Sequence, residues 1–319
     1  MKTLTQTIDL LESKKISSLE ITQECLAKTN AGNNSFISVL SDLSLEDAKK
    51  SDERRSQNKV YSRLDGIPYS LKDLFVTKNI RTTAGSKILY NYIPPFDGHV
   101  AQKFKEAGSI LVGKVGCDEF GMGSTNECTP YGAVLNPLNK AFVAGGSSGG
   151  SAASVAEGSS YFSIGTDTGG SVRLPANFCG LVGFKPSYGR VSRFGQIAYG
   201  SSLDQASPMA RSVSDISLLM EILSVKDPKD STQATHSLMK TFENLKKINP
   251  DFIKNKKIGF DPSFIDSCSS EIKKSLQLAL DNFSKMGAHI SEVSLPHLKH
   301  CVSVYYIIAT AEASANLAR

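Results

Sequence analysis

The sequence has few cysteines for its length, and their spacing excludes two common uses of this residue. The chain of 319 residues contains six cysteines, and no two of them form a C-x-x-C pair. A zinc site or a redox motif of that kind is therefore not expected, and we predict no bound metal. Six cysteines are also too sparse for a disulfide framework, so we expect a reducing, cytoplasmic location.

Long apolar runs and blocks of like charge are missing as well. The first residues, 1–13, lack the pattern of a signal peptide, and no run of about 20 apolar residues predicts a membrane span. The net charge is +5, and no block of five or six like charges marks a nucleic-acid-binding tail. These features indicate an ordinary globular chain without a membrane anchor, and the mild basicity is compatible with an RNA-bearing partner.

Glycine and serine, in contrast, are concentrated in two clusters. Gly-Gly-Ser-Ser-Gly-Gly occupies residues 145–150, and Asp-Thr-Gly-Gly-Ser occupies residues 167–171. Because glycine lets the backbone approach a ligand closely, these clusters are expected to expose backbone N–H groups beside hydroxyls. Acyl transfer needs a nucleophilic hydroxyl and N–H donors for the developing oxyanion. A flexible loop would explain one such cluster, but two clusters joined by helix-like residues 152–156 and strand-like residues 161–164 favour a site.

A serine nucleophile needs a base, and Lys72 is a candidate because apolar residues surround it in the sequence. The ordinary pKa of lysine, about 10.4, would have to fall by roughly 3.4 units for half of the amines to be neutral at pH 7, and burial can cause such a shift. Asp73 would oppose the shift unless it points to the opposite face of a strand. The alternative for any single lysine is a solvated surface cation.

Helical and strand-like segments alternate along the chain, which favours an α/β sheet layered by helices. Ser17 and Glu20 match a capping box, S-x-x-E, at the start of one helix. The expected helices span residues 3–13, 17–30, 44–58, 99–107, 213–223 and 270–286, and the expected strands span residues 110–114, 257–260 and 290–293.

Three segments resemble the motifs of the amidase signature family. They are D-G-I-P-Y-S-L-K-D at 65–73, G-G-S-S-G-G-S-A-A at 145–153 and G-T-D-T-G-G-S-V-R-L-P-A at 165–176. The resemblance implies an α/β fold with a central, mostly mixed β-sheet covered by helices on both faces. It also implies a triad in which Lys72 is the base, Ser147 is a bridging serine after a cis peptide bond, and Ser171 is the nucleophile.

Further residues around this triad are expected to support it. The oxyanion hole would consist of the backbone N–H groups of four consecutive residues, Thr168, Gly169, Gly170 and Ser171. Supporting contacts are expected from Ser148, Asp167, Arg173 and Asp204. A structural ion pair remote from the substrate is the alternative for the three charged residues.

Other segments are similar to the family of A subunits of the amidotransferases that act on glutamyl-tRNA(Gln). They are G-R-V-S-R-F-G at 189–195, S-S-L-D-Q at 201–205 and the apolar segment 305–319. The similarity implies a glutaminase in which Ser171 attacks the side-chain amide of glutamine and ammonia is released. A partner B subunit would use this ammonia, ATP and Mg²⁺ to convert Glu-tRNA(Gln) to Gln-tRNA(Gln), and a small C subunit would complete a heterotrimer. No cofactor is expected in this chain.

Such A subunits continue well beyond the position of residue 319, so we expect a C-terminally truncated chain. Groups that hold the α-carboxylate and α-amino group of glutamine would follow that residue. Tyr305 and Tyr306 are candidates for lining the substrate pocket, with core packing as the alternative. We predict an N-terminal helical segment at 1–60, packed on an amidase core at 61–319.

Two competing motif matches are weaker. Residues 108–115 nearly match a phosphate-binding P-loop, but Val115 stands where Ser or Thr would bind Mg²⁺. Ser147 and Ser148 each satisfy G-x-S-x-G, which needs a later catalytic histidine, and no histidine lies in a recognisable motif. A glutaminase subunit is therefore our prediction; a stand-alone amidase of the same family and a non-catalytic assembly subunit or fragment are the alternatives.

Overall fold

The computed structural model describes residues 1–234 and 240–318, and its contacts divide the chain into two compact units. Unit 1 comprises Met1–Phe242 and Ala309–Arg319, and unit 2 comprises Glu243–Ile308. The helices of the predicted N-terminal segment 1–60 pack on the sheet of unit 1. The boundary between residues 60 and 61 stays a prediction.

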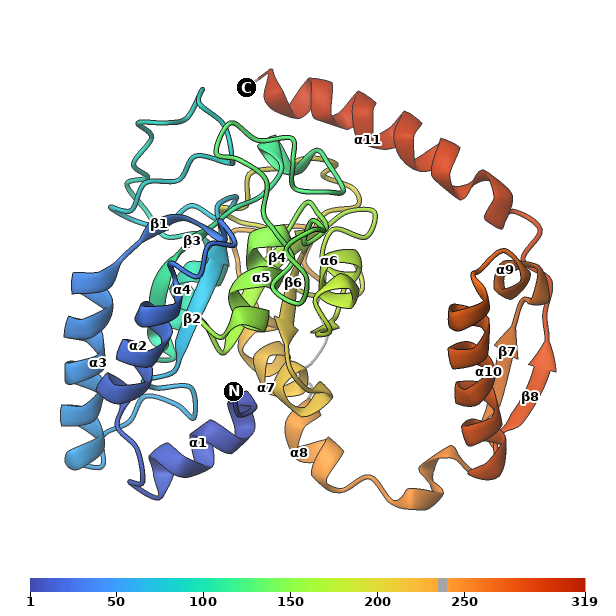
Figure 1. Ribbon diagram of the computed structural model, residues 1–319, viewed down its shortest axis with the longest axis horizontal. Coiled ribbons are helices and arrows are strands. Elements are labelled where there is room, and N and C mark those ends of the chain that lie inside the picture. Colours follow the sequence, from blue (N-terminus) through green and yellow to red (C-terminus); the bar gives the residue numbers. More distant parts are fainter. Residues whose placement is uncertain (235–239, 319) are drawn as a thin grey trace. The chain divides into compact units, whose positions relative to one another are not determined.

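A six-stranded mixed sheet forms the centre of unit 1 (Figure 1). Its strands are β1 (Phe36–Val39), β2 (Pro68–Lys72), β3 (Ile110–Val115), β4 (Phe162–Asp167), β5 (Val182–Gly183) and β6 (Gln205–Ala210). The strand order is β1-β3-β2-β4-β6-β5, with β2 parallel to β3 and to β4. The outer pairs, β1 with β3, β4 with β6 and β5 with β6, are antiparallel. The mixed sheet confirms the predicted fold class.

Helices pack on this sheet as the alternating pattern predicts. The helices that lie wholly in unit 1 are α1 (Leu4–Glu12), α2 (Ser18–Lys28), α3 (Ser41–Ser56), α4 (His99–Glu106), the 3₁₀ turn η1 (Glu119–Gly121), α5 (Gly149–Glu157), α6 (Arg173–Phe178) and α7 (Val213–Leu223). The predicted helices in this part of the chain are confirmed, with ends shifted by a few residues. The capping box is also confirmed, because Ser17 Oγ accepts a hydrogen bond from Glu20 N at 3.1 Å and Glu20 Oε2 accepts one from Ser17 N at 2.7 Å.

Side chains that alternate along each strand give the sheet two different faces. On one face, Tyr69, Leu71 and Phe162 join an apolar core with residues of α1, α2, α4 and α7. On the other face, Ser70 and Lys72 meet hydroxyl groups of α5 and of the loop before it. The candidate site therefore lies on the face that is polar and buried at the same time.

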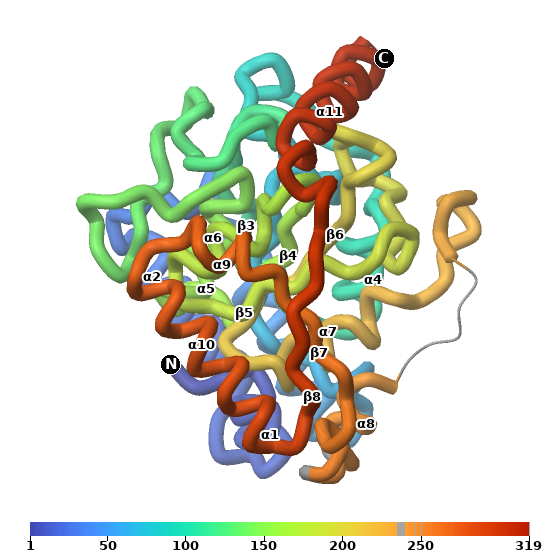
Figure 2. Tube along the Cα trace, turned by 90° about the vertical axis from the view of Figure 1, so that its right-hand side faces the viewer, coloured from blue at the N-terminus to red at the C-terminus, as the bar shows by residue number. Residues whose placement is uncertain are grey.

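Unit 2 contains a two-stranded parallel sheet of β7 (Lys257–Phe260) and β8 (His289–Glu292). Parallel strands need a crossover connection, which α10 (Ser270–Lys285) provides, and Figure 2 shows this helix beside the strands. The other elements are the 3₁₀ turns η2 (Pro250–Ile253) and η3 (Leu298–His300) and the helix α9 (Pro262–Asp266). The division between the units passes through α8 (Thr241–Lys246) and α11 (Cys301–Leu317). The two strands and the helix predicted here are confirmed.

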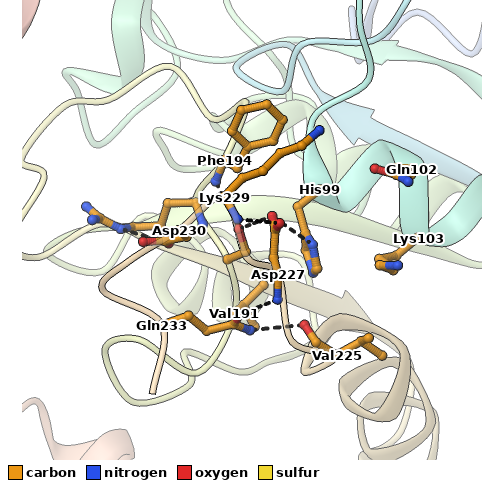
Figure 3. A network of polar contacts seen from close by, with 12 residues as sticks. His99, Gln102, Lys103, Val191, Phe194, Val225, Asp227, Lys229, Asp230 and Gln233 are labelled. Atoms are coloured by element: carbon orange, nitrogen blue, oxygen red, sulfur yellow. Dashed lines mark hydrogen bonds and ion pairs between the residues drawn. The ribbon is translucent and has the colours of Figure 1, made fainter. Parts of the chain in front are cut away.

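A buried polar network fastens the segment after α7 to the rest of unit 1 (Figure 3). Asp227 Oδ2 accepts a hydrogen bond from Ser192 Oγ at 2.7 Å and lies 3.3 Å from His99 Nδ1. Asp227 Oδ1 accepts a hydrogen bond from Lys229 N at 2.9 Å. One carboxylate thus joins α4, the segment around Ser192 and the segment after α7.

Replacing Asp227 with alanine is expected to lower the free energy of unfolding by about 2–4 kcal/mol, because the buried side chains of His99 and Ser192 and the backbone N–H of Lys229 lose their shared acceptor. The measurement is urea unfolding at pH 7. Lys226→Ala, which truncates an exposed neighbour, serves as the control and should change stability by less than about 0.5 kcal/mol. Equal stability of the two variants would contradict an anchoring role for Asp227.

Candidate active site

Lys72 is the last residue of β2, and its side chain is completely buried. Its Nζ donates hydrogen bonds to Ser147 Oγ at 2.8 Å, Ser148 Oγ at 2.9 Å and Thr166 Oγ1 at 2.7 Å. All three partners are neutral hydroxyls, so none of them is a carboxylate that would stabilise the protonated amine. The structure thus brings Lys72, Ser147 and Ser148 together as the motifs predict.

Burial lowers the pKa of Lys72 to about 8, against the opposing influence of Cys117, Asp118, Asp204 and Asp167. With that pKa, about one amine in ten is neutral at pH 7 and half are neutral near pH 8. A neutral Nζ can accept the proton of the Ser147 hydroxyl instead of donating to it. The lysine therefore has both the position and the acidity of a general base.

Ser147 follows a cis peptide bond from Gly146, the geometry that the family resemblance implies. The surrounding loop is held by the bond from Asp118 N to the Ser147 carbonyl at 3.3 Å and by the bond from Gly146 N to the Ser124 carbonyl at 2.7 Å. Only glycine fits at position 146, because a Cβ there would overlap Asp118 Oδ2 and Asn126 N. The glycines of this cluster thus allow the backbone to pack closely around the serine.

The turn that carries Ser171 is organised by the buried carboxylate of Asp167. Its Oδ1 accepts a hydrogen bond from Gly170 N at 2.9 Å, and its Oδ2 accepts bonds from Val172 N and Arg173 N at 3.2 Å each. The Arg173 guanidinium also binds both oxygens, at 3.0 and 2.9 Å. Burial alone would raise the pKa of Asp167, but the bonds from Arg173 and the backbone outweigh it and hold the pKa below its ordinary value. The predicted Asp167–Arg173 pair therefore forms directly beside the turn that carries Ser171.

Ser171 itself is half-buried, and its carbonyl accepts a hydrogen bond from Ser148 N at 3.1 Å. This bond joins the two glycine–serine clusters. Of the four backbone donors predicted for the oxyanion hole, the Gly170 N–H is already donated to Asp167. The roles of the Thr168, Gly169 and Ser171 N–H groups stay predictions.

Asp204 supports the same turn from the other side. Its Oδ1 accepts a hydrogen bond from Thr168 Oγ1 at 2.6 Å, and its two oxygens accept bonds from Tyr199 N at 2.8 Å and Gly200 N at 3.0 Å. The C-terminal part of α11, which belongs to unit 1, holds this region through Asn316 Nδ2, which donates to the Tyr199 carbonyl at 3.0 Å. Asp204 thus binds Thr168, which agrees with its expected supporting role, whereas the contact from Asn316 of α11 was not expected from the sequence.

Thr166 is a contact of Lys72 that sequence reasoning missed. A signal was present, since Thr166 lies inside the motif at 165–176. The sequence did not reveal how β2 and β4 are aligned. They are parallel neighbours in the sheet, with Leu71 opposite Ile164. That pairing brings the end of β4 level with Lys72.

Tyr305 and Tyr306 lie in the part of α11 that belongs to unit 2. Their rings meet edge to face, with centroids 5.3 Å apart, and Tyr306 is exposed. Their predicted role in the substrate pocket, which involves the site in unit 1, stays a prediction.

The secondary structure excludes a P-loop at residues 108–115. Residues 110–115 form the strand β3 instead of a loop that could surround a phosphate group. Across residues 1–234 and 240–318, no three His, Cys, Asp or Glu side chains are grouped so that they could hold a metal ion. In the same residues, no helix combines the length and the apolar character needed to cross a bilayer.

A family model described as Amidase matches residues 19–319. The chain belongs to the amidase signature family. The A subunit of the glutamyl-tRNA(Gln) amidotransferase of Koribacter versatilis is 46% identical over 287 residues, which cover 90% of this chain and 59% of that relative. The chain thus spans about three fifths of the length of this curated relative.

Solved structures of the family agree with this assignment. The crystal structure of the A subunit of glutamyl-tRNA(Gln) amidotransferase from Thermotoga maritima superimposes with a TM-score of 0.83 at 35% identity, covering 99% of this chain and 66% of that one. The native peptide amidase from Stenotrophomonas maltophilia gives a TM-score of 0.88 at 26% identity, covering 99% of this chain and 66% of that one. The fold is therefore shared by A subunits of amidotransferases and by amidases with other names.

Proposed function

We propose that this chain carries the glutaminase site of a tRNA-dependent amidotransferase. The observation that carries the proposal is the buried Lys72 amine, 2.8 Å from the Ser147 hydroxyl and joined through Ser148 to the turn of Ser171. Relatives named as A subunits of glutamyl-tRNA(Gln) amidotransferase, at 43–46% identity, support glutamine as the substrate.

In the proposed reaction, Ser171 Oγ attacks the side-chain amide carbon of glutamine. The hydroxyl proton passes through Ser147 to the neutral amine of Lys72, and backbone N–H groups of the nucleophile turn stabilise the oxyanion. The C–N bond then breaks, the leaving nitrogen takes the proton back, and ammonia departs from a glutamyl ester of Ser171. Water attacks that ester, glutamate is released, and the serine hydroxyl is restored.

The proposal extends to partners. B and C subunits would assemble with this chain into a heterotrimer, and the B subunit would bind ATP and Mg²⁺ and transfer the ammonia to Glu-tRNA(Gln). Because a charged tRNA is the final acceptor, the cytoplasm is the proposed location. No cofactor is proposed for this chain itself.

A stand-alone amidase is the second candidate function, favoured by the structural likeness to the peptide amidase of Stenotrophomonas maltophilia. The triad chemistry would be the same, and only the amide substrate and the need for a partner would differ. A non-catalytic assembly subunit is the third candidate. Substrate range separates the first two, and acylation of Ser171 separates both from the third.

The function is tested with glutamine and hydroxylamine, which captures a glutamyl ester as γ-glutamyl hydroxamate. With B and C subunits of a related amidotransferase present, we expect hydroxamate and ammonia from glutamine at rates at least tenfold above those from simple aliphatic amides. Mass spectrometry detects the hydroxamate, and a coupled assay detects ammonia. Faster turnover of simple amides, with no effect of the partners, would replace the proposal with a stand-alone amidase.

A further inference from the structure

A buried carboxylate that the proposed reaction does not use lies beside the bridging serine. Asp118 lies between β3 and η1, and its side chain is completely buried. Its backbone N–H donates a hydrogen bond to the Ser147 carbonyl at 3.3 Å. Burial raises the pKa of Asp118, and hydrogen bonds from backbone N–H groups of Cys128 and Asn126 oppose that rise. Burying a carboxylate costs stability unless its oxygens are hydrogen-bonded, so the bonds that this side chain makes indicate what it does.

Both oxygens of the carboxylate hold the loop at residues 121–128. Oδ2 accepts a hydrogen bond from Asn126 N at 3.0 Å, and Oδ1 accepts one from Cys128 N at 3.0 Å. The loop begins beside the candidate site, since a Cβ on Gly121 would lie 3.7 Å from Ser147 Oγ. The carboxylate therefore links the end of β3 to a loop that borders the bridging serine.

The same loop binds the backbone before and after Ser147. Before the serine, Gly146 N donates a hydrogen bond to the Ser124 carbonyl at 2.7 Å. After the serine, Gly150 N, in the first turn of α5, donates one to Asn126 Oδ1 at 3.3 Å. The position of the serine backbone thus depends on the position of the loop that the carboxylate holds.

Two glycines from different segments make room for the carboxylate. A Cβ on Gly146 would lie 2.2 Å from Asp118 Oδ2, and a Cβ on Gly123 would lie 2.3 Å from Asp118 Cγ. Non-bonded carbon atoms do not approach so closely, so both positions need glycine while the carboxylate keeps its place. The carboxylate is therefore in close contact with the loop and with the backbone directly before Ser147.

We propose that Asp118 is a positioning residue of the amidase site, which holds the Ser147 hydroxyl against Lys72 by joining the loop at 121–128 to the backbone around Ser147. The inference rests on the proposed function, because Ser147 passes the proton to Lys72 in that reaction. Lys72 Nζ lies 2.8 Å from Ser147 Oγ, and proton transfer needs a contact of this length. A displacement of about 1 Å can lower the rate of such a reaction by about 100-fold.

The test compares four forms of the full 319-residue chain: the wild type, Asp118→Asn, Ser147→Ala and the double variant. The measured quantity is the rate of labelling by a small fluorophosphonate per folded molecule. Asp118→Asn keeps the shape of the side chain but turns an amide toward one of the two backbone N–H groups, so the loop loses a bond. The rate is expected to fall roughly 10- to 100-fold. Asp42→Asn, which removes an exposed carboxylate of unit 1, is the matched control and should be labelled like the wild type.

In the Ser147→Ala background, Asp118→Asn should lower the residual rate by less than about twofold, because the hydroxyl through which Asp118 acts is already missing. An equal loss in both backgrounds would overturn the proposal, since a merely structural role slows both alike. Wild-type labelling of Asp118→Asn would also overturn it.

Gly123→Ala is a second variant, which displaces the carboxylate without removing its charge. The added methyl group overlaps Asp118 Cγ, so labelling should slow in the same direction, and again only while the Ser147 hydroxyl is present. If Asp118→Asn does not fold, Gly123→Ala replaces it in the comparison, with the same outcomes for and against the proposal.

Hydrogen exchange followed by mass spectrometry needs no reactive serine, so it separates this inference from the proposed function. In Asp118→Asn, amides in the peptides that cover residues 121–128 and 144–150 are expected to exchange at least tenfold faster than in the wild type. If the wild type is not labelled but both peptides exchange faster, the proposed function fails and the positioning of the serine backbone by Asp118 stands. Faster exchange confined to residues 121–128 overturns the inference.

Discussion

Replacing Ser171 with alanine is expected to abolish covalent labelling of the protein by a small fluorophosphonate and to reduce glutamine hydrolysis by roughly 10⁴-fold or more. The reason is that the acyl-enzyme needs an oxygen at this position, and alanine removes it without disturbing the turn. Asp167 holds that turn through backbone N–H groups and Arg173, none of which involves the Ser171 side chain. Intact-mass spectrometry should show one adduct on the wild type and none on the variant.

The matched control is Ser187→Ala, which removes an exposed hydroxyl of unit 1 and should be labelled like the wild type. Peptide mapping of the wild-type adduct should identify the peptide that contains Ser171. An adduct that persists in Ser171→Ala, or that maps to Ser147 or Ser148, would show that another hydroxyl of the cluster is the nucleophile.

Replacing Lys72 with methionine, a side chain of similar length, is expected to slow labelling at pH 8 by roughly 10³-fold, because the proton of Ser147 loses its acceptor. The pH dependence should change as well. In the wild type the rate should rise with pH through a midpoint near 8, since only the neutral amine acts as the base. In Lys72→Met that rise should be absent, and stopped-flow labelling across pH 6 to 10 measures it.

Lys72→Met should also change how the free energy of unfolding depends on pH. The folded-state pKa of Lys72, about 8, lies below the unfolded value of about 10.4, so between these values the unfolded chain binds more protons and stability rises with pH. The rise from pH 8 to pH 10.4 should amount to about 2.5 kcal/mol in the wild type and be missing in Lys72→Met. If Lys72→Met keeps this rise, Lys72 is not the group with the lowered pKa. If Lys72→Met is labelled at the wild-type rate, Lys72 is not the base.

Lys72, Ser147 and Ser171 could be singled out from the sequence because each of them lies in a local motif, and the structure confirms the contact between Lys72 and Ser147. The role of Ser171 as the nucleophile stays a prediction. Glycine and serine cluster around residues 147 and 171, and apolar residues surround Lys72. Each of these patterns is visible within a few residues of the sequence. The contact between Lys72 and Thr166 could not be predicted, since it depends on the register of two strands that are far apart in the sequence. Local patterns do not fix such a register.

Lys114 illustrates the same limit more sharply. In the sequence it ends the strand-like run 110–114, and the pattern around it indicates only an incomplete P-loop. Its burial follows from parallel neighbours, because β3 pairs with β2 so that Lys114 lies opposite Leu71 and close to Asp73. The separation of unit 2 at 243–308 was missed for another reason: helices and strands alternate on both sides of that boundary, and nothing in their pattern changes there.

The contact between α11 and the turn beside Asp204 sets an order of events during synthesis. Asn316 and Glu312 bind the turn at 199–202, and Asp204 in the same turn region holds Thr168. A ribosome that adds about 5–20 residues per second delivers Asn316 on the order of 10 s after Asp204. Throughout that interval the nascent chain contains Lys72, Ser147 and Ser171, while the turn at 199–202 still lacks its α11 contacts. The α11 contacts can therefore form only after the residues of the candidate site, which lie within the first 171, have been synthesised.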